Sequence, residues 1–175
     1  MAEAAEGNDT TILICYDASP EAADTIAYVA GLLPGAKAVV VAVWKPIVEE
    51  LLAGPPDAPP IGDPVGANER QQEAALVVAE QGAKLASKAG LHAEAGVVEA
   101  TDSLWEAIEE AAGQLHARLI ACGTSRSGVT AALPGNLASS LVQHSSRAVL
   151  VVPSAKAVAQ RRRATKSERG ARIRG

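Results

Sequence analysis

The sequence predicts an α/β fold, a single open five-stranded parallel sheet in the order 3-2-1-4-5 with helices on both faces. Short apolar runs alternate with longer segments of helical apolar spacing, giving the pattern βαβαβαβαβ. Such alternation builds a parallel sheet covered by helices. The runs 36–44 and 117–123 are apolar without alternation, as expected of strands buried on both faces. Right-handed crossovers leave few strand orders, and 3-2-1-4-5 is the common five-stranded one.

The chain begins with a strand, a helix and a second strand. Residues 10–17 form a short run rich in β-branched side chains, which predicts a buried strand. Ser19 suits a helix N-cap and Pro20 the first helical position, so a helix is expected to start there. The Pro-Gly pair at 34–35 ends this helix. The second strand covers 36–44.

A long loop and a long helix come next. Six prolines and three glycines fall within 45–67, which predicts a loop with at most one short helical turn near 47–52. Loops of this length usually carry function or move. Apolar residues at helical spacing then predict a helix over 68–89, which Gly90 ends.

The second half of the chain adds three strands and two helices. Residues 92–100 alternate in polarity and are expected to form a strand near an edge of the sheet. Asp102 is expected to cap the next helix. The fourth strand covers 117–123, the last helix 136–145 and the fifth strand 147–153.

The charge divides the chain into an acidic body and a basic end. The net charge is −4, yet residues 156–175 carry eight basic side chains against Glu168 alone. This end therefore carries +7 and the remaining residues −11. We expect a flexible leader over 1–9, one domain over 10–155 and a disordered basic tail over 156–175. The tail either aids solubility or binds nucleic acid or another anionic surface.

Cysteine use and hydropathy favour a cytoplasmic protein. Cys15 and Cys122 each lie within an apolar run and lack metal or redox spacing, so both are expected to be buried thiols in a reducing compartment. We expect no signal peptide and no membrane span, because no apolar run approaches the required length of about 20 residues. With no Phe, two Trp and two Tyr, stacking on single-stranded nucleic acid is disfavoured.

The expected strand order points to a binding site. In such sheets, ligands bind beyond the carboxyl ends of the strands, where the winding direction changes, here between the first and fourth strands. Asp17, after the first strand, either accepts hydrogen bonds from an adenine amino group or a ribose hydroxyl, or caps its own loop. Val43, near the end of the second strand, either meets a base through its backbone or packs in the core.

The stretch "GTSRSGVTAALPGNLASS" from residue 123 supplies the other side of this site. Gly123 has no side chain, which allows a ligand to approach closely. Hydroxyls at Thr124 and at residues 125 and 127 are candidate donors, and Arg126 is a candidate phosphate partner. Gly135 and Asn136 suit the turn and N-cap before a helix, whose free N–H groups, that of Leu137 included, attract anions. The same pattern also describes an ordinary capped helix.

Several catalytic and cofactor motifs are missing from the sequence. GxxxxGK[ST] is absent, and GxGxxG does not follow the first strand. His92, His116 and His144 lack metal-binding spacing, and His144 is expected to be structural. Nucleophile, base and orienting residues do not converge near the expected site. We therefore expect no metal and no enzyme activity beyond slow ATP hydrolysis.

Three segments together resemble the universal stress protein (UspA-like) family. They are "ILICYDAS", "VVVAVW" and "LIACGTSRSG…LPGNLASSLVQHSSRAVLVVP", and the similarity covers roughly residues 10–153. The resemblance implies an adenine nucleotide alpha hydrolase-like fold. ATP-binding members resemble G-x2-G-x9-G-[ST] in the last segment. By this resemblance Asp17 and Val43 hold adenine, while Gly123 and the pair Gly135-Asn136 hold ribose and phosphates.

The sequence departs from the ATP-binding pattern in its loop. Arg126 stands at the second glycine position, and the loop is one residue shorter. Gly128 is a partial substitute for the missing glycine, and Asn136 replaces Ser or Thr. The resemblance still makes ATP the first expected ligand, and the shorter loop makes AMP and cyclic AMP the alternatives.

The resemblance also implies a homodimer in a stress-response protein. Family members commonly pair their fifth strands, and the apolar run 147–153 would be an aggregation risk as an open edge. We expect residues 149–152 to lie near the dimer interface. The alternative function is a dimeric interaction module that works without nucleotide, through loop 45–67 or the basic tail. A hydrolase or electron-transfer subunit of similar architecture is the weakest possibility, because the additional motifs it needs are absent.

Overall fold

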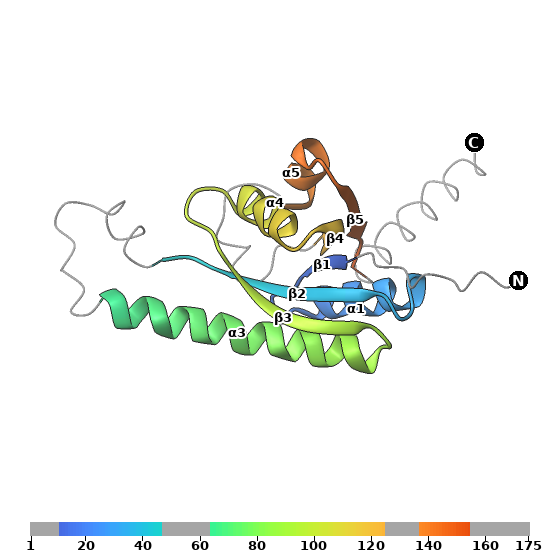
Figure 1. The fold of residues 1–175 in the computed structure, drawn as a ribbon, viewed down its shortest axis with the longest axis horizontal. Helices are drawn as coiled ribbons and strands as arrows, with labels where there is room; N and C mark the ends of the chain where they lie inside the picture. Colours follow the sequence, from blue (N-terminus) through green and yellow to red (C-terminus); the bar gives the residue numbers. More distant parts are fainter. Residues whose placement is uncertain (1–10, 47–63, 125–136, 155–175) are drawn as a thin grey trace, which may run out of the picture.

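A computed structural model describes residues 11–46, 64–124 and 137–154. Strands and helices alternate along this part of the chain (Figure 1). The elements in order are β1 (Thr11–Cys15), α1 (Pro20–Leu32), β2 (Lys37–Trp44), α3 (Pro64–Lys88), β3 (His92–Glu99), α4 (Leu104–Gln114), β4 (Ala117–Gly123), α5 (Leu137–His144) and β5 (Ala148–Val152).

The five strands form one parallel sheet in the order β3-β2-β1-β4-β5. The predicted fold class and strand order are therefore confirmed. β1 lies at the centre, with Leu13 opposite Val39 of β2 and Ile120 of β4. β3 is an edge strand, as its alternating sequence predicts, and β5 forms the other edge.

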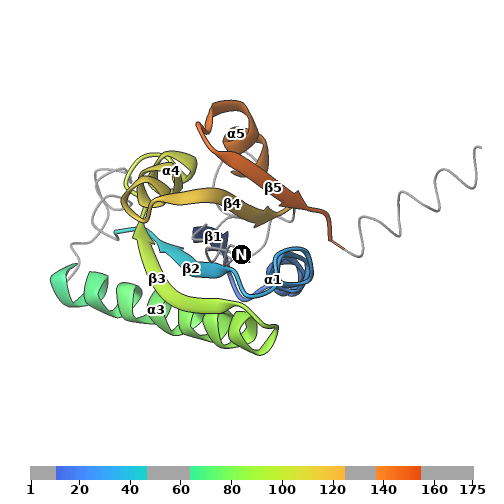
Figure 2. The ribbon, with the colours of Figure 1, turned by 45° about the vertical axis from the view of Figure 1, so that its right-hand side comes forward.

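Helices cover both faces of the sheet, α1 and α3 on one side and α4 and α5 on the other (Figures 1 and 2). Ile26 of α1 and Ala86 of α3 pack with Ile14 in one core cluster. Ile108 of α4 and Leu141 of α5 pack in a second cluster on the opposite face. These side chains are all aliphatic, as the scarcity of aromatic residues in the sequence requires.

Helix α1 begins as its sequence predicts. Ser19 has an extended backbone, and its hydroxyl accepts a hydrogen bond from the N–H of Ala22 (3.1 Å). Pro20 stands at the first helical position, where no N–H is needed. Gly35 follows the helix with a φ of 75°, a conformation that suits glycine.

Two helix starts and one strand length differ from the sequence-based prediction. α3 begins at Pro64 and not at residue 68, because a proline is tolerated in the first helical turn; the predicted loop 45–67 is therefore too long at its end. Ser103, not Asp102, is the N-cap residue of α4, since its backbone is extended and its carbonyl accepts from the N–H of Ala107 (3.1 Å). β1 covers only 11–15 of the expected 10–17.

Three predicted segments lie outside the described residues. They are the leader 1–9, the helical turn near 47–52 and the basic tail 156–175. Within the described residues, no helix is long and apolar enough to cross a membrane.

Candidate functional site at the carboxyl ends of the strands

The loop after β1 places Asp17 at the point where the sheet changes winding direction. The chain leaves β1 after Cys15, and Ala18 takes a left-handed φ of 61° before α1 begins. One carboxylate oxygen of Asp17, which is half-buried, accepts a hydrogen bond from the N–H of Ser19 (3.1 Å). Asp17 therefore caps its own loop, as one of the two sequence-based interpretations holds, and this bond engages Oδ1.

The backbone of Val43 faces the same region. The N–H of Tyr16 donates to the carbonyl of Val41 (2.9 Å), after which the chain turns away toward α1. Along a parallel strand, alternate residues direct their N–H and C=O to the same neighbour. The N–H and C=O of Val43 therefore point to the side of β2 on which β1 lies, at a level beyond the end of β1. The carbonyl of Trp44 points to the opposite side of β2, where it accepts a hydrogen bond from the N–H of Ala100 (2.9 Å). The side chain of Val43 packs against the second core cluster.

The end of β4 approaches helix α1 and strand β5. A Cβ at Gly123 would lie 3.4 Å from Oγ1 of Thr25 and 3.5 Å from the carbonyl oxygen of Glu21, which is ordinary van der Waals contact. The missing side chain of Gly123 thus faces α1. The N–H of Thr124 donates to the carbonyl of Val152 (3.1 Å), and the hydroxyl of Thr124 accepts from the N–H of Ser154 (3.3 Å).

The structure brings the first half of the predicted site together. β1 lies between β2 and β4, so the ends that carry Asp17, Val43, Gly123 and Thr124 share one edge of the sheet. Leu137 is the first residue of α5 and packs against the second core cluster. The remaining predicted residues, Arg126, Gly128, Gly135 and Asn136, lie outside the described residues.

Sequence reasoning missed one residue at this edge. Ser154 is buried and ties the segment after β5 to Thr124 through its N–H. Only the proline that ends the fifth apolar run marks its position in the sequence. The bond leaves the hydroxyl hydrogen of Thr124 available as a donor.

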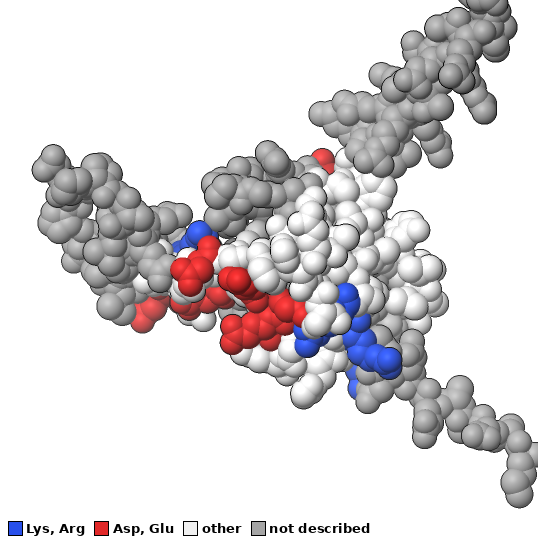
Figure 3. Space-filling view, turned by 90° about the horizontal axis from the view of Figure 1, so that it is seen from above, with Lys and Arg blue, Asp and Glu red and all other residues white. Residues whose placement is uncertain are grey.

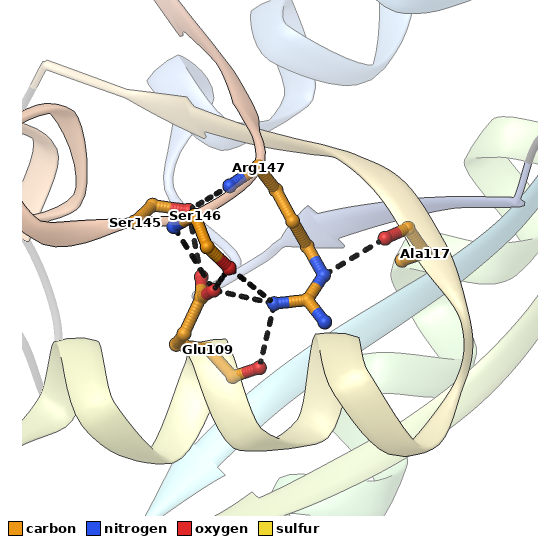
Figure 4. Close-up of polar contacts among 5 residues, drawn as sticks. All are labelled: Glu109, Ala117, Ser145, Ser146 and Arg147. Atoms are coloured by element: carbon orange, nitrogen blue, oxygen red, sulfur yellow. Dashed lines mark hydrogen bonds and ion pairs between the residues drawn. The ribbon is translucent and has the colours of Figure 1, made fainter.

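A cluster of polar residues around Glu109 lies at the amino ends of β4 and β5, opposite the carboxyl ends that form the candidate site (Figure 4). The hydroxyls of Ser145 and Ser146 donate to the two carboxylate oxygens of Glu109 (2.6 Å each), and Arg147 forms an ion pair with it. The Nε of Arg147 also donates to the carbonyl of Ala117 (3.0 Å). Because Ala117 starts β4 and Arg147 precedes β5, this cluster lies away from the candidate site.

Glu109 is held as a carboxylate by its neighbours. Partial burial works to raise its pKa, but the hydrogen bonds from Ser145 and Ser146 and the charge of Arg147 outweigh burial and lower the pKa from 4.5. His144, nearby on α5, stacks on Trp105 with ring centroids 4.9 Å apart. This contact gives His144 the structural role expected for it.

The molecular surface on the side of α4 and α5 is acidic near its centre (Figure 3). Asp and Glu side chains gather in the middle of the view in Figure 3, and most Lys and Arg side chains lie to one side. Among the described residues, no group of three or more His, Cys, Asp or Glu side chains is arranged to hold a metal ion. An acidic surface repels nucleic acid, so this face does not favour nucleic-acid binding.

Comparisons with known proteins agree with this fold. The model of the universal stress protein family matches residues 10–153. A search of the curated proteins finds no match. A universal stress family protein from Burkholderia pseudomallei superposes with a TM-score of 0.58 at 21% identity, covering 83% of this chain and 97% of that one.

Two further solved structures hold a nucleotide. A universal stress protein in complex with cAMP has a TM-score of 0.53 at 16% identity, covering 82% of this chain and 96% of that one. A universal stress family protein from Arabidopsis thaliana with AMP bound has a TM-score of 0.52 at 12% identity, covering 84% and 94%. At these identities the comparison shows a shared fold.

Proposed function

Because the chain belongs to the universal stress protein family, we propose that it binds an adenine nucleotide at the carboxyl ends of β1, β2 and β4. The observation that carries the proposal is that Asp17 follows β1 at the carboxyl end of the sheet, where the backbone N–H and C=O of Val43 on the neighbouring β2 point to the side of β1. A carboxylate acceptor beside a backbone donor and acceptor suits the edge of an adenine ring and a ribose hydroxyl.

The adenosine part of the ligand is common to ATP, AMP and cyclic AMP. Asp17 and Val43 would contact this common part, while the phosphates would lie toward β4 and the start of α5. ATP is the first ligand of the proposal, and the AMP-bound and cAMP-bound neighbours support the smaller nucleotides. The loop, one residue shorter than in the ATP-binding pattern, also favours a ligand with fewer phosphates.

Calorimetric titration of the full chain with ATP, AMP and cyclic AMP tests the proposal. Guanosine monophosphate is the matched control, since it keeps the ribose and phosphate of AMP and changes the base. We expect at least one adenine nucleotide to bind roughly tenfold more tightly than GMP, because a base edge is read by hydrogen bonds. No heat and no shift in melting temperature with millimolar adenine nucleotide would contradict the proposal.

We propose binding with slow or no hydrolysis, in the cytoplasm. The sequence gives no set of nucleophile, base and orienting residues near the site, and His144 is stacked on Trp105 away from it. ADP release from ATP, followed in the same samples, measures this directly. Turnover at the rate of an ordinary enzyme, about 10 per second, would contradict a binding role.

A homodimer paired through β5 completes the proposal. β5 is an edge strand, with Val149 and Val151 directing their N–H and C=O groups away from β4. A second copy of the strand would form hydrogen bonds with these groups.

The same edge strand supports the second candidate function, a dimeric interaction module that needs no nucleotide. Dimerisation together with failure of every nucleotide titration would favour that candidate.

A further inference from the structure

The two cysteines of the chain lie opposite each other on neighbouring strands. The register of β1 and β4 pairs Ile14 with Ala121, and the next residues along the two strands are Cys15 and Cys122. Cys122 is buried, and Cys15 is half-buried at the last position of β1. Both are free thiols.

The two side chains also share one face of the sheet. Cys122 belongs to the core cluster beneath α4 and α5, and Cys15 packs against the same cluster. Leu13 and Ile120, two positions earlier on each strand, belong to it as well, as the alternation of side chains along a strand requires. Burial, and then the nearby Cys122, raise the pKa of Cys15.

We propose that Cys15 and Cys122 form an oxidation site, at which a hydroperoxide converts the two thiols into an intramolecular disulfide. Neighbouring strands lie about 4.8 Å apart. This spacing falls within the Cα separations of roughly 4.4–6.8 Å that disulfides bridge. The sheet therefore holds the two residues at bonding distance without a change of strand order.

The reaction balances with a hydroperoxide as the oxidant. Cys15 is the more exposed residue of the two, and its sulfur attacks the terminal peroxide oxygen. The O–O bond breaks, and the other peroxide oxygen leaves with the thiol proton as an alcohol, or as water when the oxidant is hydrogen peroxide. The sulfur of Cys122 then attacks that of the sulfenic acid on Cys15; an S–S bond forms, the S–O bond breaks, and the hydroxide leaves as water with the proton of Cys122. The two sulfurs lose two electrons in total, and the peroxide gains them.

Burial makes this reaction slow and the product reversible. It raises the pKa of Cys15, the attacking thiol, well above its ordinary value, and that of Cys122 to about 11, so little thiolate is present at neutral pH. Residues directly opposite on parallel strands differ from the relaxed geometry of a disulfide, and strained disulfides are reduced readily. Oxidation would join the last residue of β1 to the next-to-last residue of β4, the two strands that lead into the candidate site. The bond would thus be a reversible covalent link next to that site.

Intact mass measurement tests the proposal on the full chain. The protein is reduced, freed of reductant, treated with hydrogen peroxide and then alkylated with N-ethylmaleimide. Because the chain has two cysteines, the disulfide appears as a fall from two alkylated thiols to none. Trypsin should release residues 1–37 linked to 119–126, and dithiothreitol should restore both thiols.

Single substitutions separate the two sulfurs. In Cys122→Ala, oxidation should stop at a sulfenic acid on Cys15, which dimedone traps; in Cys15→Ala, Cys122 should stay reduced. Two alkylated thiols after peroxide, chains linked to each other, or further oxidation of Cys15 with Cys122 still reduced would each overturn the proposal. If a variant does not fold, the cross-linked peptide pair from the unmodified sequence decides the result.

Discussion

Gly82 of α3 lies directly against the ring of Tyr16, at the point where the chain leaves β1. A Cβ added at Gly82 would come within 2.7 Å of the Cδ1 of Tyr16 and of the Cγ1 of Val40. Both of these side chains are buried in the core. The absence of a side chain at residue 82 therefore allows α3 to approach the sheet.

We expect Gly82→Ala to lower the free energy of unfolding. Overpacking of a closed core costs about 1–3 kcal/mol, which exceeds the gain of about 1 kcal/mol that alanine brings to a helix. The matched control is Gly31→Ala in α1, where a Cβ meets no atom within 4 Å. This control should be stabilising in urea titration, and equal effects of the two substitutions would contradict the packing argument.

Glu109→Gln should destabilise the fold through the cluster with Arg147. The substitution removes the carboxylate charge that pairs with the partly buried guanidinium of Arg147. It also replaces one of the two carboxylate oxygens that accept hydrogen bonds from the hydroxyls of Ser145 and Ser146. Hydrogen bonds to charged groups contribute about 1.5–3 kcal/mol each, so we expect a loss of about 2 kcal/mol in urea titration. Glu110→Gln on the exposed side of the same helix is the control, and its effect should stay within about 0.5 kcal/mol. Equal losses of unfolding free energy in the two variants would show that the effect of Glu109→Gln does not come from the cluster.

The contribution of Glu109 should also depend on pH. Its pKa is lower in the folded chain than the ordinary 4.5, so its carboxylate stabilises the fold above that value. The contribution is lost as the pH falls through the folded pKa. The difference in unfolding free energy between the parent chain and Glu109→Gln should therefore be constant above about pH 5.5 and shrink at lower pH. A constant difference down to about pH 3 would contradict this assignment.

Asp17→Asn separates the two roles of Asp17. The amide oxygen can still accept the hydrogen bond from Ser19, so the melting temperature should change little. The amide nitrogen replaces an acceptor oxygen with a donor, which would oppose an adenine amino group or a ribose hydroxyl. We expect adenine nucleotide affinity to fall roughly tenfold in calorimetry. Unchanged affinity would place Asp17 outside the binding site.

Val151→Pro tests pairing through β5. The N–H of Val151 faces away from β4, so proline removes a hydrogen bond to a second copy and leaves the β4 ladder complete. Val151→Ala is the control, because it shortens the side chain and keeps the N–H. Light scattering should find monomers for the proline variant and dimers for the alanine variant and the parent chain. A monomeric parent chain would reject the dimer.

The fold was predictable because its signals are local. Strands buried on both faces leave unbroken apolar runs such as 36–44, and Ser19 with Pro20 marks a helix start. The errors are local too. Asp102 and Ser103 are both good caps, and the structure selects Ser103, which has the extended backbone of an N-cap residue.

The candidate site was only partly predictable. Asp17 and Val43 follow from the strand order, which brings their strand ends to one edge. The juxtaposition of Cys15 with Cys122, and of Glu109 with Arg147, depends on the register and packing of elements distant in sequence. Composition and spacing carry no signal for such pairs.

The central position of β1 has a consequence for synthesis on the ribosome. β1 emerges first, yet its partner β4 and the helices α4 and α5 are made last. Until residue 123 leaves the exit tunnel, one edge of β1 stays unpaired, and the apolar face that carries Leu13, Val41 and Val98 stays uncovered. Such surfaces promote aggregation. We therefore expect the nascent chain to be most prone to aggregation until its second half has been made.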